Sequence, residues 1–218
     1  EVRWQQKSDR VWMDFSSEKG DIHLACPSQA FALIPTEVID YQSVNDFLKK
    51  ALREVLPENV QGISLTLRSE VLDTPFYHYS HGLRKHDGNC QRIAHGHRSP
   101  VTVFENGIAE PKWDQYWAER WHDIYLGTEE DLVSVKTLEL SKQTKISDET
   151  HFGFHYVAPQ GDFQLAMPKH CCDLIPHDTT VEMLAEYMAK TLASQAPESH
   201  FKVIAYEGIG KGAIAVRG

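Results

Sequence analysis

The chain has 218 residues, of which 41% are hydrophobic and 24% are charged. This length and composition fit one or two globular domains with an adequate core. The net charge of −9 disfavours nucleic acid as the main partner, since phosphate binding depends on a basic face. No run approaches the roughly 18 apolar residues of a membrane helix, so no membrane partner is expected.

The cysteines and the first residues bear on where the protein works. The chain has four cysteines, Cys26, Cys90, Cys171 and Cys172, and they form no C-x-x-C pair. Cys171 and Cys172 are adjacent, and adjacent cysteines are poor disulfide partners for each other. This usage is typical of a reducing compartment, and we expect a cytoplasmic protein. Residue 1 is Glu, and no signal peptide is visible. Residues 1–7 resemble the interior of a longer chain. We therefore expect an upstream part of the native protein to be absent.

Early in the chain, residues 20–35 closely resemble residues 161–176. Eight of these sixteen positions are identical without a gap, at an offset of 141 residues. Such internal similarity indicates duplicated units.

The similarity continues into a helix and a strand in each copy. Residues 43–56 and 180–192 both carry apolar side chains at helical spacing. Residues 62–68 alternate apolar and polar side chains, which predicts a strand, and residues 201–207 are their counterpart. In the second copy, Thr179 and Glu182 have the spacing of a capping box.

A cluster of potential metal ligands lies between the two copies. His95 and His97 are two residues apart, so on a strand both side chains leave the same face. A third histidine, His81, ends an aromatic run, and Cys90 adds a thiol nearby. Three neutral imidazoles leave one position of a tetrahedral zinc open, which is the pattern of catalytic sites. The alternative is a polar hairpin with solvated histidines.

The remaining elements complete the second copy. Strands are predicted over residues 71–85 and 95–106, followed by an aromatic-rich helix over 113–126, whose aromatic side chains fit core packing. Further strands are predicted over 132–140 and 151–157. The two predicted repeats are residues 1–70, which hold only the second half of such a unit, and residues 71–218, which hold a complete one.

Residues 71–218 resemble the 6-pyruvoyltetrahydropterin synthase and 6-carboxytetrahydropterin synthase family. Four motifs in family order carry the resemblance: Ser80-His81-Gly-Leu, Cys90 ahead of His95-Gly-His97, Thr179-Thr180-Val-Glu182, and Glu207. The resemblance implies an α+β fold of the T-fold type, a four-stranded antiparallel sheet with two helices on one face. Here that unit is expected in tandem duplication, with the first copy incomplete.

The resemblance also implies roles for the matching residues. His81, His95 and His97 match the zinc ligands, and Cys90 matches the thiol that acts as general acid and base. Glu207 matches the carboxylate that anchors the pterin. Thr179 and Thr180 match the segment that contacts the pterin from a neighbouring subunit.

One departure concerns the histidine that relays protons beside the cysteine. The family has an Asp-His pair near the end of its first helix, and the matching residues here are Lys169 and His170. His170 can serve as the histidine, but Lys169 stands where an Asp is expected. A carboxylate fixes the tautomer of its histidine partner. The substitute is expected to be Asp173 or Asp178.

The leading hypothesis is a zinc-dependent pterin synthase that acts on 7,8-dihydroneopterin triphosphate. One carboxylate can accept both hydrogens of the guanidine-like edge of a dihydropterin. The triphosphate needs cations, and five are candidates: Arg84, Lys85, Arg92, Arg98 and Lys211. The 6-carboxytetrahydropterin product of the 7-deazapurine (queuosine) pathway is favoured over 6-pyruvoyltetrahydropterin. The four residues between Cys90 and His95 do not decide between these branches.

Two other hypotheses remain open. One is a non-catalytic pterin or purine binder that keeps the zinc and Glu207. The other is an assembly protein in which the zinc is structural. A sheet with unpaired edges invites pairing, so we expect a homo-oligomer in each case.

Overall fold

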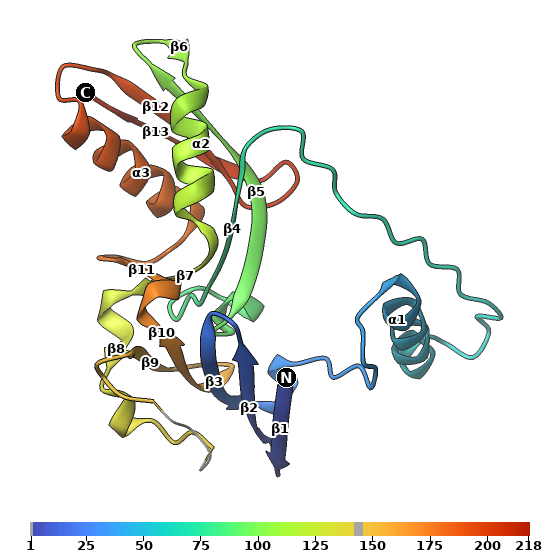
Figure 1. The fold of residues 1–218 in the computed structure, drawn as a ribbon. Helices are drawn as coiled ribbons and strands as arrows, with labels where there is room; N and C mark the ends of the chain where they lie inside the picture. Colours follow the sequence, from blue (N-terminus) through green and yellow to red (C-terminus); the bar gives the residue numbers. More distant parts are fainter. Residues whose placement is uncertain (1, 142–145) are drawn as a thin grey trace. The chain divides into compact units, whose positions relative to one another are not determined.

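A computed structural model of the chain describes residues 2–141 and 146–218 as an α+β fold (Figure 1). The described residues form two compact units. One unit joins the residues up to Ala30 with Leu72–Gly218, and the other is Phe31–Val71. The first 30 residues belong to the larger unit because their strands pair with strands from the second half of the chain. The predicted repeats 1–70 and 71–218 therefore do not coincide with the compact units, and the duplication stays a prediction.

The first sheet of the larger unit has six strands in the order β1-β2-β3-β10-β9-β8, all antiparallel to their neighbours. Their bounds are Val2–Lys7 for β1, Arg10–Ser17 for β2, Gly20–Pro27 for β3, Gly161–Pro168 for β10, His151–Ala158 for β9 and Leu132–Val133 for β8. The sequence pattern did not predict β1 and β2. One face of this sheet is apolar, and the opposite face carries polar side chains such as Asp14 and His23, which are hydrogen-bonded to each other.

The two similar sequence segments meet in the middle of this sheet. The hairpins β2–β3 and β9–β10 have equal strand lengths at the 141-residue offset, and β3 pairs with β10. Leu24 lies directly opposite Leu165, its counterpart at that offset. The two segments thus pair about a local two-fold axis that passes between these leucines.

The second sheet has seven strands, with the order β11-β7-β4-β5-β12-β13 and β6 beside β5. Their bounds are Cys172–Ile175 for β11, His122–Thr128 for β7, Phe76–His81 for β4, His95–Glu105 for β5, Phe201–Tyr206 for β12, Gly212–Arg217 for β13 and Ile108–Ala109 for β6. Four of them, β4-β5-β12-β13, form the expected antiparallel series.

The expectation of a four-stranded sheet is nevertheless wrong. β7 pairs with β4 in parallel, and β11 pairs with β7, so the sheet continues past the edge that β4 was expected to form. Pairing is the usual way in which a protein satisfies the free backbone groups of an edge strand.

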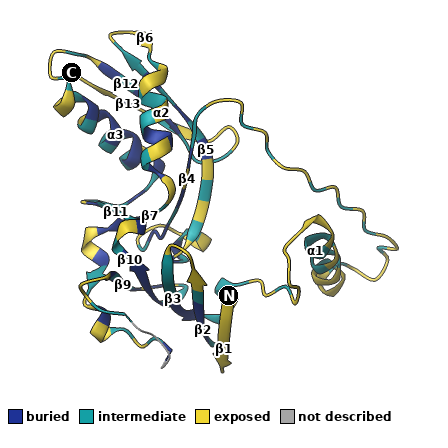
Figure 2. Cartoon of the chain, viewed as in Figure 1, coloured by how far each residue is buried: buried dark blue, intermediate teal, exposed yellow. Residues whose placement is uncertain are grey.

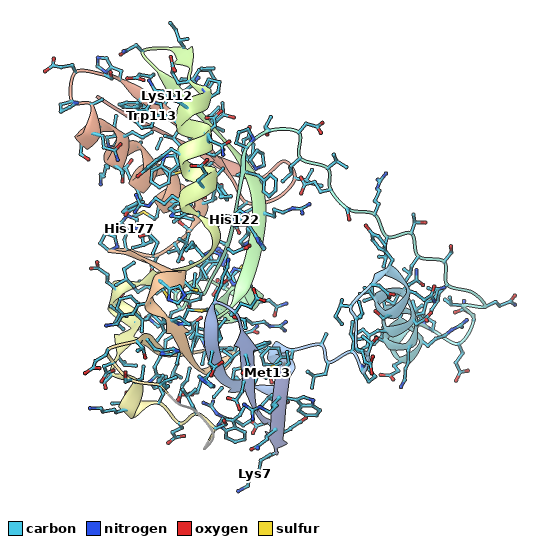
Figure 3. The ribbon with its side chains drawn as sticks, in the orientation of Figure 1. Lys7, Met13, Lys112, Trp113, His122 and His177 are labelled. Carbon is cyan, nitrogen blue, oxygen red and sulfur yellow. The ribbon has the colours of Figure 1, made fainter. Side chains whose placement is uncertain are left out.

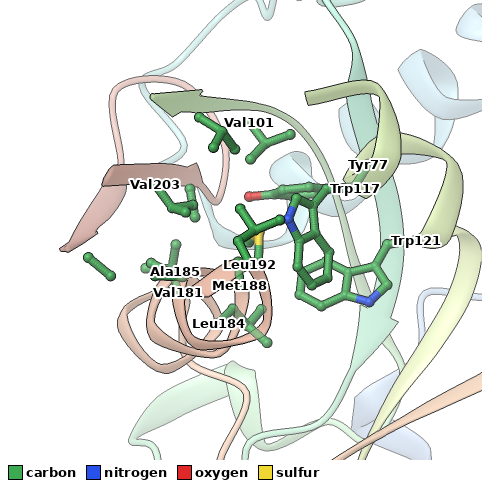
Figure 4. Close-up of a cluster of buried hydrophobic side chains, with 14 of the residues drawn as sticks. Tyr77, Val101, Trp117, Trp121, Val181, Leu184, Ala185, Met188, Leu192 and Val203 are labelled. Carbon is green, nitrogen blue, oxygen red and sulfur yellow. The ribbon is translucent and has the colours of Figure 1, made fainter. Parts of the chain in front are cut away.

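Two helices cover one face of the second sheet. α2 (Pro111–Arg120) packs on β4 and β5, and α3 (Val181–Gln195) packs on β12 and β13. Between helices and sheet lies a core in which Trp117, Met188 and Val203 are fully buried (Figure 4). Because α3 presents a buried residue at nearly every turn, it is fixed against the sheet along its length.

Several element boundaries differ from the sequence predictions. The predicted helix over 113–126 ends at Arg120, and the chain continues as β7 because its residues pair with β4. The predicted strand over 132–140 is reduced to Leu132–Val133. Helix α3 is capped by Thr180, whose hydroxyl accepts a hydrogen bond from the Met183 amide, and not by Thr179.

The smaller unit contains α1 (Tyr41–Val55) and no strand among its described residues. The helix begins with a capping box between Asp40 and Ser43, but none of its residues is buried (Figure 2). Residues 62–68, predicted as a strand, form neither strand nor helix. An alternating pattern specifies the two faces of a strand, whereas the strand itself forms only where a neighbour satisfies its backbone.

The close approach of the two hairpins gives a testable prediction. Gly161 has φ of +130°, and a Cβ at this position would lie 2.3 Å from Cγ of Pro27. We expect Gly161→Ala to lower the free energy of unfolding by about 2–4 kcal/mol, from backbone strain and overpacking together. Urea denaturation measures this change.

The matched control is Gly107→Ala, where φ is +82° and no atom lies within 4 Å of the added Cβ. This variant carries only the backbone strain, so its loss is expected to be about 1 kcal/mol. Equal losses in the two variants would contradict the predicted contact between the hairpins.

Candidate metal centre

The three predicted histidine ligands lie on one face of the β4–β5 pair. His81 is directly opposite His95, and Tyr79 is directly opposite His97. Side chains alternate between the two faces of a strand, and directly paired residues share a face. The ring centroids of the three histidines are therefore close: 4.3 Å for His81–His95, 5.1 Å for His81–His97 and 5.2 Å for His95–His97.

The Nε2 atoms of these rings are free to bind a metal. One nitrogen atom from each histidine lies within 4.8 Å of the other two. All three Nε2 atoms are buried and have no hydrogen-bond partner among the described residues. Imidazole nitrogens at this spacing fit zinc, whose catalytic sites take three protein ligands and leave a fourth position for water or substrate.

The Nδ1 atoms of two of these rings are held by the surrounding protein. His95 donates an Nδ1–H hydrogen bond of 3.0 Å to the carbonyl oxygen of Arg92. Nδ1 of His81 lies 2.8 Å from the hydroxyl oxygen of Thr179. A proton on Nδ1 leaves the lone pair on Nε2, which is the tautomer that a metal ligand requires. Thr180 and not Thr179 caps α3, so the Thr179 hydroxyl is available to orient His81, a candidate ligand.

Burial keeps the imidazoles neutral. It lowers the pKa of His81 well below its usual value of 6.5, and the neighbouring His95 lowers it further. Burial also lowers the pKa of His95 and of His97, in part against the opposing effect of Glu207. Neutral imidazole is the metal-binding form, so protons compete weakly for this site at neutral pH.

Glu207 lies beside the three histidines. It follows β12 directly, its side chain is 6% exposed, and its Oε1 is 3.5 Å from Nε2 of His97. The same oxygen is 3.3 Å from Nζ of Lys211, across the turn between β12 and β13. The carboxylate is not part of the group of nitrogen atoms that converge within 4.8 Å. Glu207 is thus a neighbour of the candidate metal centre.

Cys90 reaches the same end of the sheet through a short 3-10 helix, η2 (Gly88–Gln91). Its carbonyl oxygen accepts a hydrogen bond from the amide of Leu83, two residues after His81. The thiol is partly buried and does not belong to the converging ligand group. This arrangement differs from that of a closed structural site, in which the thiolate binds the metal directly.

The predicted proton relay does not form in the structure. His170 lies exposed in η5 (Lys169–Cys171), and no hydrogen bond joins it to an acid in the part of the chain that the structure describes. The carboxylate of Asp173 accepts hydrogen bonds from Arg120 and Trp121 instead. Asp178 lies 3.7 Å from Lys85.

The structure shows an imidazole–carboxylate pair that the sequence analysis missed. Nδ1 of His78 lies 2.6 Å from the carboxylate of Asp123, and His122 lies 3.4 Å from the same group. His122 is labelled in Figure 3. The hydrogen bond from His78 is the main cause that lowers the pKa of Asp123. His78 lies on the face of β4 opposite to His81, as period-two alternation requires. That alternation was visible in the sequence, but the pairing with β7 was not.

The other candidate cations are differently placed. Arg84 and Lys85 form ion pairs with Glu130, and Arg84 forms a second one with Asp131. The Arg98 guanidinium lies 5.4 Å from the ring centroid of Phe76. Burial and neighbouring groups make the larger contributions to the pKa values of His81 and His97. Of the five candidate cations, Lys211 is the one whose charge lowers both pKa values further.

Comparison with known proteins found similarity among solved structures only. The chain is similar to the 6-pyruvoyl tetrahydropterin synthase of Plasmodium falciparum, with 10% identity, a TM-score of 0.44, and coverage of 65% of this chain and 91% of that chain. It is also similar to the enzyme of that name from Plasmodium vivax, with 12% identity, a TM-score of 0.45, and coverage of 67% and 95%. No family model and no curated protein matches the chain.

These similarities are distant and assign no substrate and no residue role to this chain. The candidate metal centre described above rests on its own geometry. Within the described residues, no helix combines the length and the apolar character that crossing a membrane requires.

The neutral histidines predict how the metal-free protein responds to acid. In the unfolded chain His81 takes up a proton near pH 6.5, whereas in the folded protein burial prevents this. The unfolded state then binds more protons, so stability falls as the pH drops below 6.5. From about pH 7.5 to about pH 5.5, His81 alone is expected to lower the free energy of unfolding by about 1.4 kcal/mol.

Urea denaturation of the chelator-treated protein at both pH values measures this loss. His81→Gln removes one of three such groups and is expected to reduce the pH-dependent loss by about 1.4 kcal/mol, whereas the contributions of His95 and His97 remain. His122→Gln, whose parent side chain is 67% exposed, serves as the control and should keep the full pH dependence. An unchanged pH dependence in His81→Gln would contradict the prediction.

Proposed function

We propose that the chain is a zinc-dependent pterin synthase that acts on 7,8-dihydroneopterin triphosphate and releases triphosphate. The observation that carries the proposal is the convergence of three buried imidazoles whose Nε2 atoms have no partner among the described residues. Such a set binds zinc and leaves one position open. Beside it lies the buried carboxylate of Glu207, and the partly buried thiol of Cys90 lies outside the ligand group.

Each residue has a chemical task in this proposal. His81, His95 and His97 hold the zinc, which supplies Lewis acidity toward the hydroxyls of the substrate side chain. Glu207 accepts two hydrogen bonds from the guanidine-like edge of the pterin, in exchange for its ion pair with Lys211. Cys90 moves the side-chain protons as general acid and base.

The proposed product is 6-carboxytetrahydropterin, as in the 7-deazapurine pathway, and 6-pyruvoyltetrahydropterin is the alternative.

Thr179 acts in this proposal by orienting His81. The proposal also includes a cytoplasmic location, a homo-oligomer and an origin by tandem duplication. The local two-fold pairing of β3 with β10 supports the duplication.

A specific observation favours a second candidate function. His170 has no acidic partner among the described residues, so the expected proton relay is incomplete. A pterin- or purine-binding protein needs the zinc and Glu207 but no relay. Tight binding of the pterin without turnover would favour this second function over the synthase.

Metal analysis tests the ligand set. Wild-type protein dialysed against zinc and then against buffer is expected to retain about one zinc per chain. His95→Ala removes one of three ligands and should lower the affinity by at least about tenfold, since even the partners of ligands contribute that much. Cys90→Ala should retain the zinc, because the thiol lies outside the ligand group. Loss of zinc in Cys90→Ala would instead indicate a closed site.

An activity assay tests the synthase itself. Zinc-loaded protein is incubated with 7,8-dihydroneopterin triphosphate, and released triphosphate and pterin products are measured. Cys90→Ala is expected to lower kcat by about 100- to 10,000-fold, the usual contribution of a general acid or base. The matched control is Cys172→Ala, whose thiol donates to the carbonyl of Pro168 in β10 and should leave kcat unchanged. Equal turnover in the two variants would remove Cys90 from the mechanism.

A further inference from the structure

A tyrosine shares the face of β4 that carries the metal-binding histidine. Tyr79 lies two residues before His81 and directly opposite His97 on β5. Its ring packs edge-on against the ring of His81, with 5.1 Å between the ring centroids. It also packs against the ring of His97 in a tilted arrangement, with 5.6 Å between the centroids. Tyr79 is thus part of the wall of the three-histidine cluster.

The Tyr79 hydroxyl is buried and unpaired. The residue is 1% exposed, and its hydroxyl oxygen has no hydrogen-bond partner among the groups that the structure describes. Tyr77, two residues earlier on the same face, differs in this respect. Its hydroxyl donates to the carbonyl of Tyr206 and accepts from the amide of the same residue.

An unpaired buried hydroxyl is costly, and a phenylalanine would fill the same space without that cost. The phenol is held in place by packing, since the ring of Tyr77 lies at 5.3 Å and that of Trp121 at 5.9 Å. It therefore cannot turn toward solvent to find a partner. A further molecule bound in the site would accept the hydrogen bond that no described group of the protein accepts.

The place of Tyr79 beside the three histidines indicates where that molecule would bind. Tyr79 and the three histidines leave the same face of the sheet, and a phenol is longer than an imidazole. The ring of Tyr79 packs against both His81 and His97, so its longer side chain favours an oxygen near the open position beside these rings. Burial, then Tyr77 and the charge of Glu207, raise the pKa of this phenol, so it stays protonated and can donate a hydrogen bond.

We propose that the Tyr79 hydroxyl donates a hydrogen bond to the molecule that takes the open position beside the three histidines. The chemical class of that molecule is a small anion or an oxygen ligand with a free lone pair. Tyr79 thereby selects ligands that accept a hydrogen bond next to their metal-binding atom. This inference rests on the metal centre of the proposed function and not on the identity of the substrate.

The experiment uses the cobalt-loaded protein with azide as the probe. Cobalt(II) in a site with three imidazoles has visible absorption bands that change when azide binds, so the dissociation constant is read directly. Tyr79→Phe removes only the hydroxyl, and azide is expected to bind about tenfold more weakly, the usual effect of losing a hydrogen bond to a charged group. Cobalt affinity itself should change by less than about twofold, because no metal ligand is lost.

Tyr77→Phe is the matched control. It removes a hydroxyl that has two partners in the protein, so azide affinity should stay unchanged while the thermal midpoint of the metal-free protein falls. In Tyr79→Phe the midpoint of the metal-free protein should stay equal or rise, since the unpaired hydroxyl is gone. Thermal unfolding of both variants thus separates a ligand-binding hydroxyl from a structural one without relying on activity.

Two results would overturn the inference. One is unchanged azide affinity in Tyr79→Phe, and the other is a lower midpoint of the metal-free Tyr79→Phe protein, which would reveal a partner within the protein. Failure of the wild type to bind cobalt would overturn the inference together with the metal centre. Cobalt binding without an effect of Tyr79→Phe overturns the inference alone.

Discussion

The candidate site depends on the register in which β4 pairs with β5. In the observed register His81 faces His95 and Tyr79 faces His97, so four ring-bearing side chains leave one face at one end of the sheet. A shift of one residue would send the β5 histidines to the opposite face, away from His81. The register is held on both sides, because β5 also pairs with β12 and β4 also pairs with β7. The common face of these four rings therefore depends on the pairing of the whole sheet.

The groups around the histidines bring distant parts of the chain to the same place. Thr179 lies 98 residues after His81 and reaches it because α3 begins at the edge of the core. Glu207 arrives at the end of β12, after α3 has packed along the sheet. The buried face of α3 thus has a functional consequence. It determines where the chain enters and leaves the site, and with it the position of the hydroxyl beside His81 and of the carboxylate.

The site combines groups that are costly to bury. Three imidazoles with free Nε2 atoms, a carboxylate at 6% exposure and an unpaired phenol lie within one small region. Stable cores normally satisfy such groups internally. A metal ion with a bound molecule would satisfy the imidazoles and the phenol together, since the ion offers a positive charge to the former and its bound molecule an acceptor to the latter. The carboxylate of Glu207 is paired with Lys211. On the polar face of the other sheet, Nδ1 of His23 is paired with Asp14, and its Nε2 is likewise buried without a partner among the described residues.

The sequence by itself determined the local features: the helical stripes of α1 and α3, and the common face of His95 and His97. Both follow from the fixed periods of helix and strand, which need no information from elsewhere in the chain. Tertiary structure decided the rest. The strand predicted over 62–68 is absent and the sheet of β4 is wider than expected, because strands form only with partners that can lie far away in sequence. For the same reason the sequence pattern predicted His170 as the proton relay and did not predict the His78–Asp123 pair. Only the pairing of strands shows which imidazole lies beside a carboxylate.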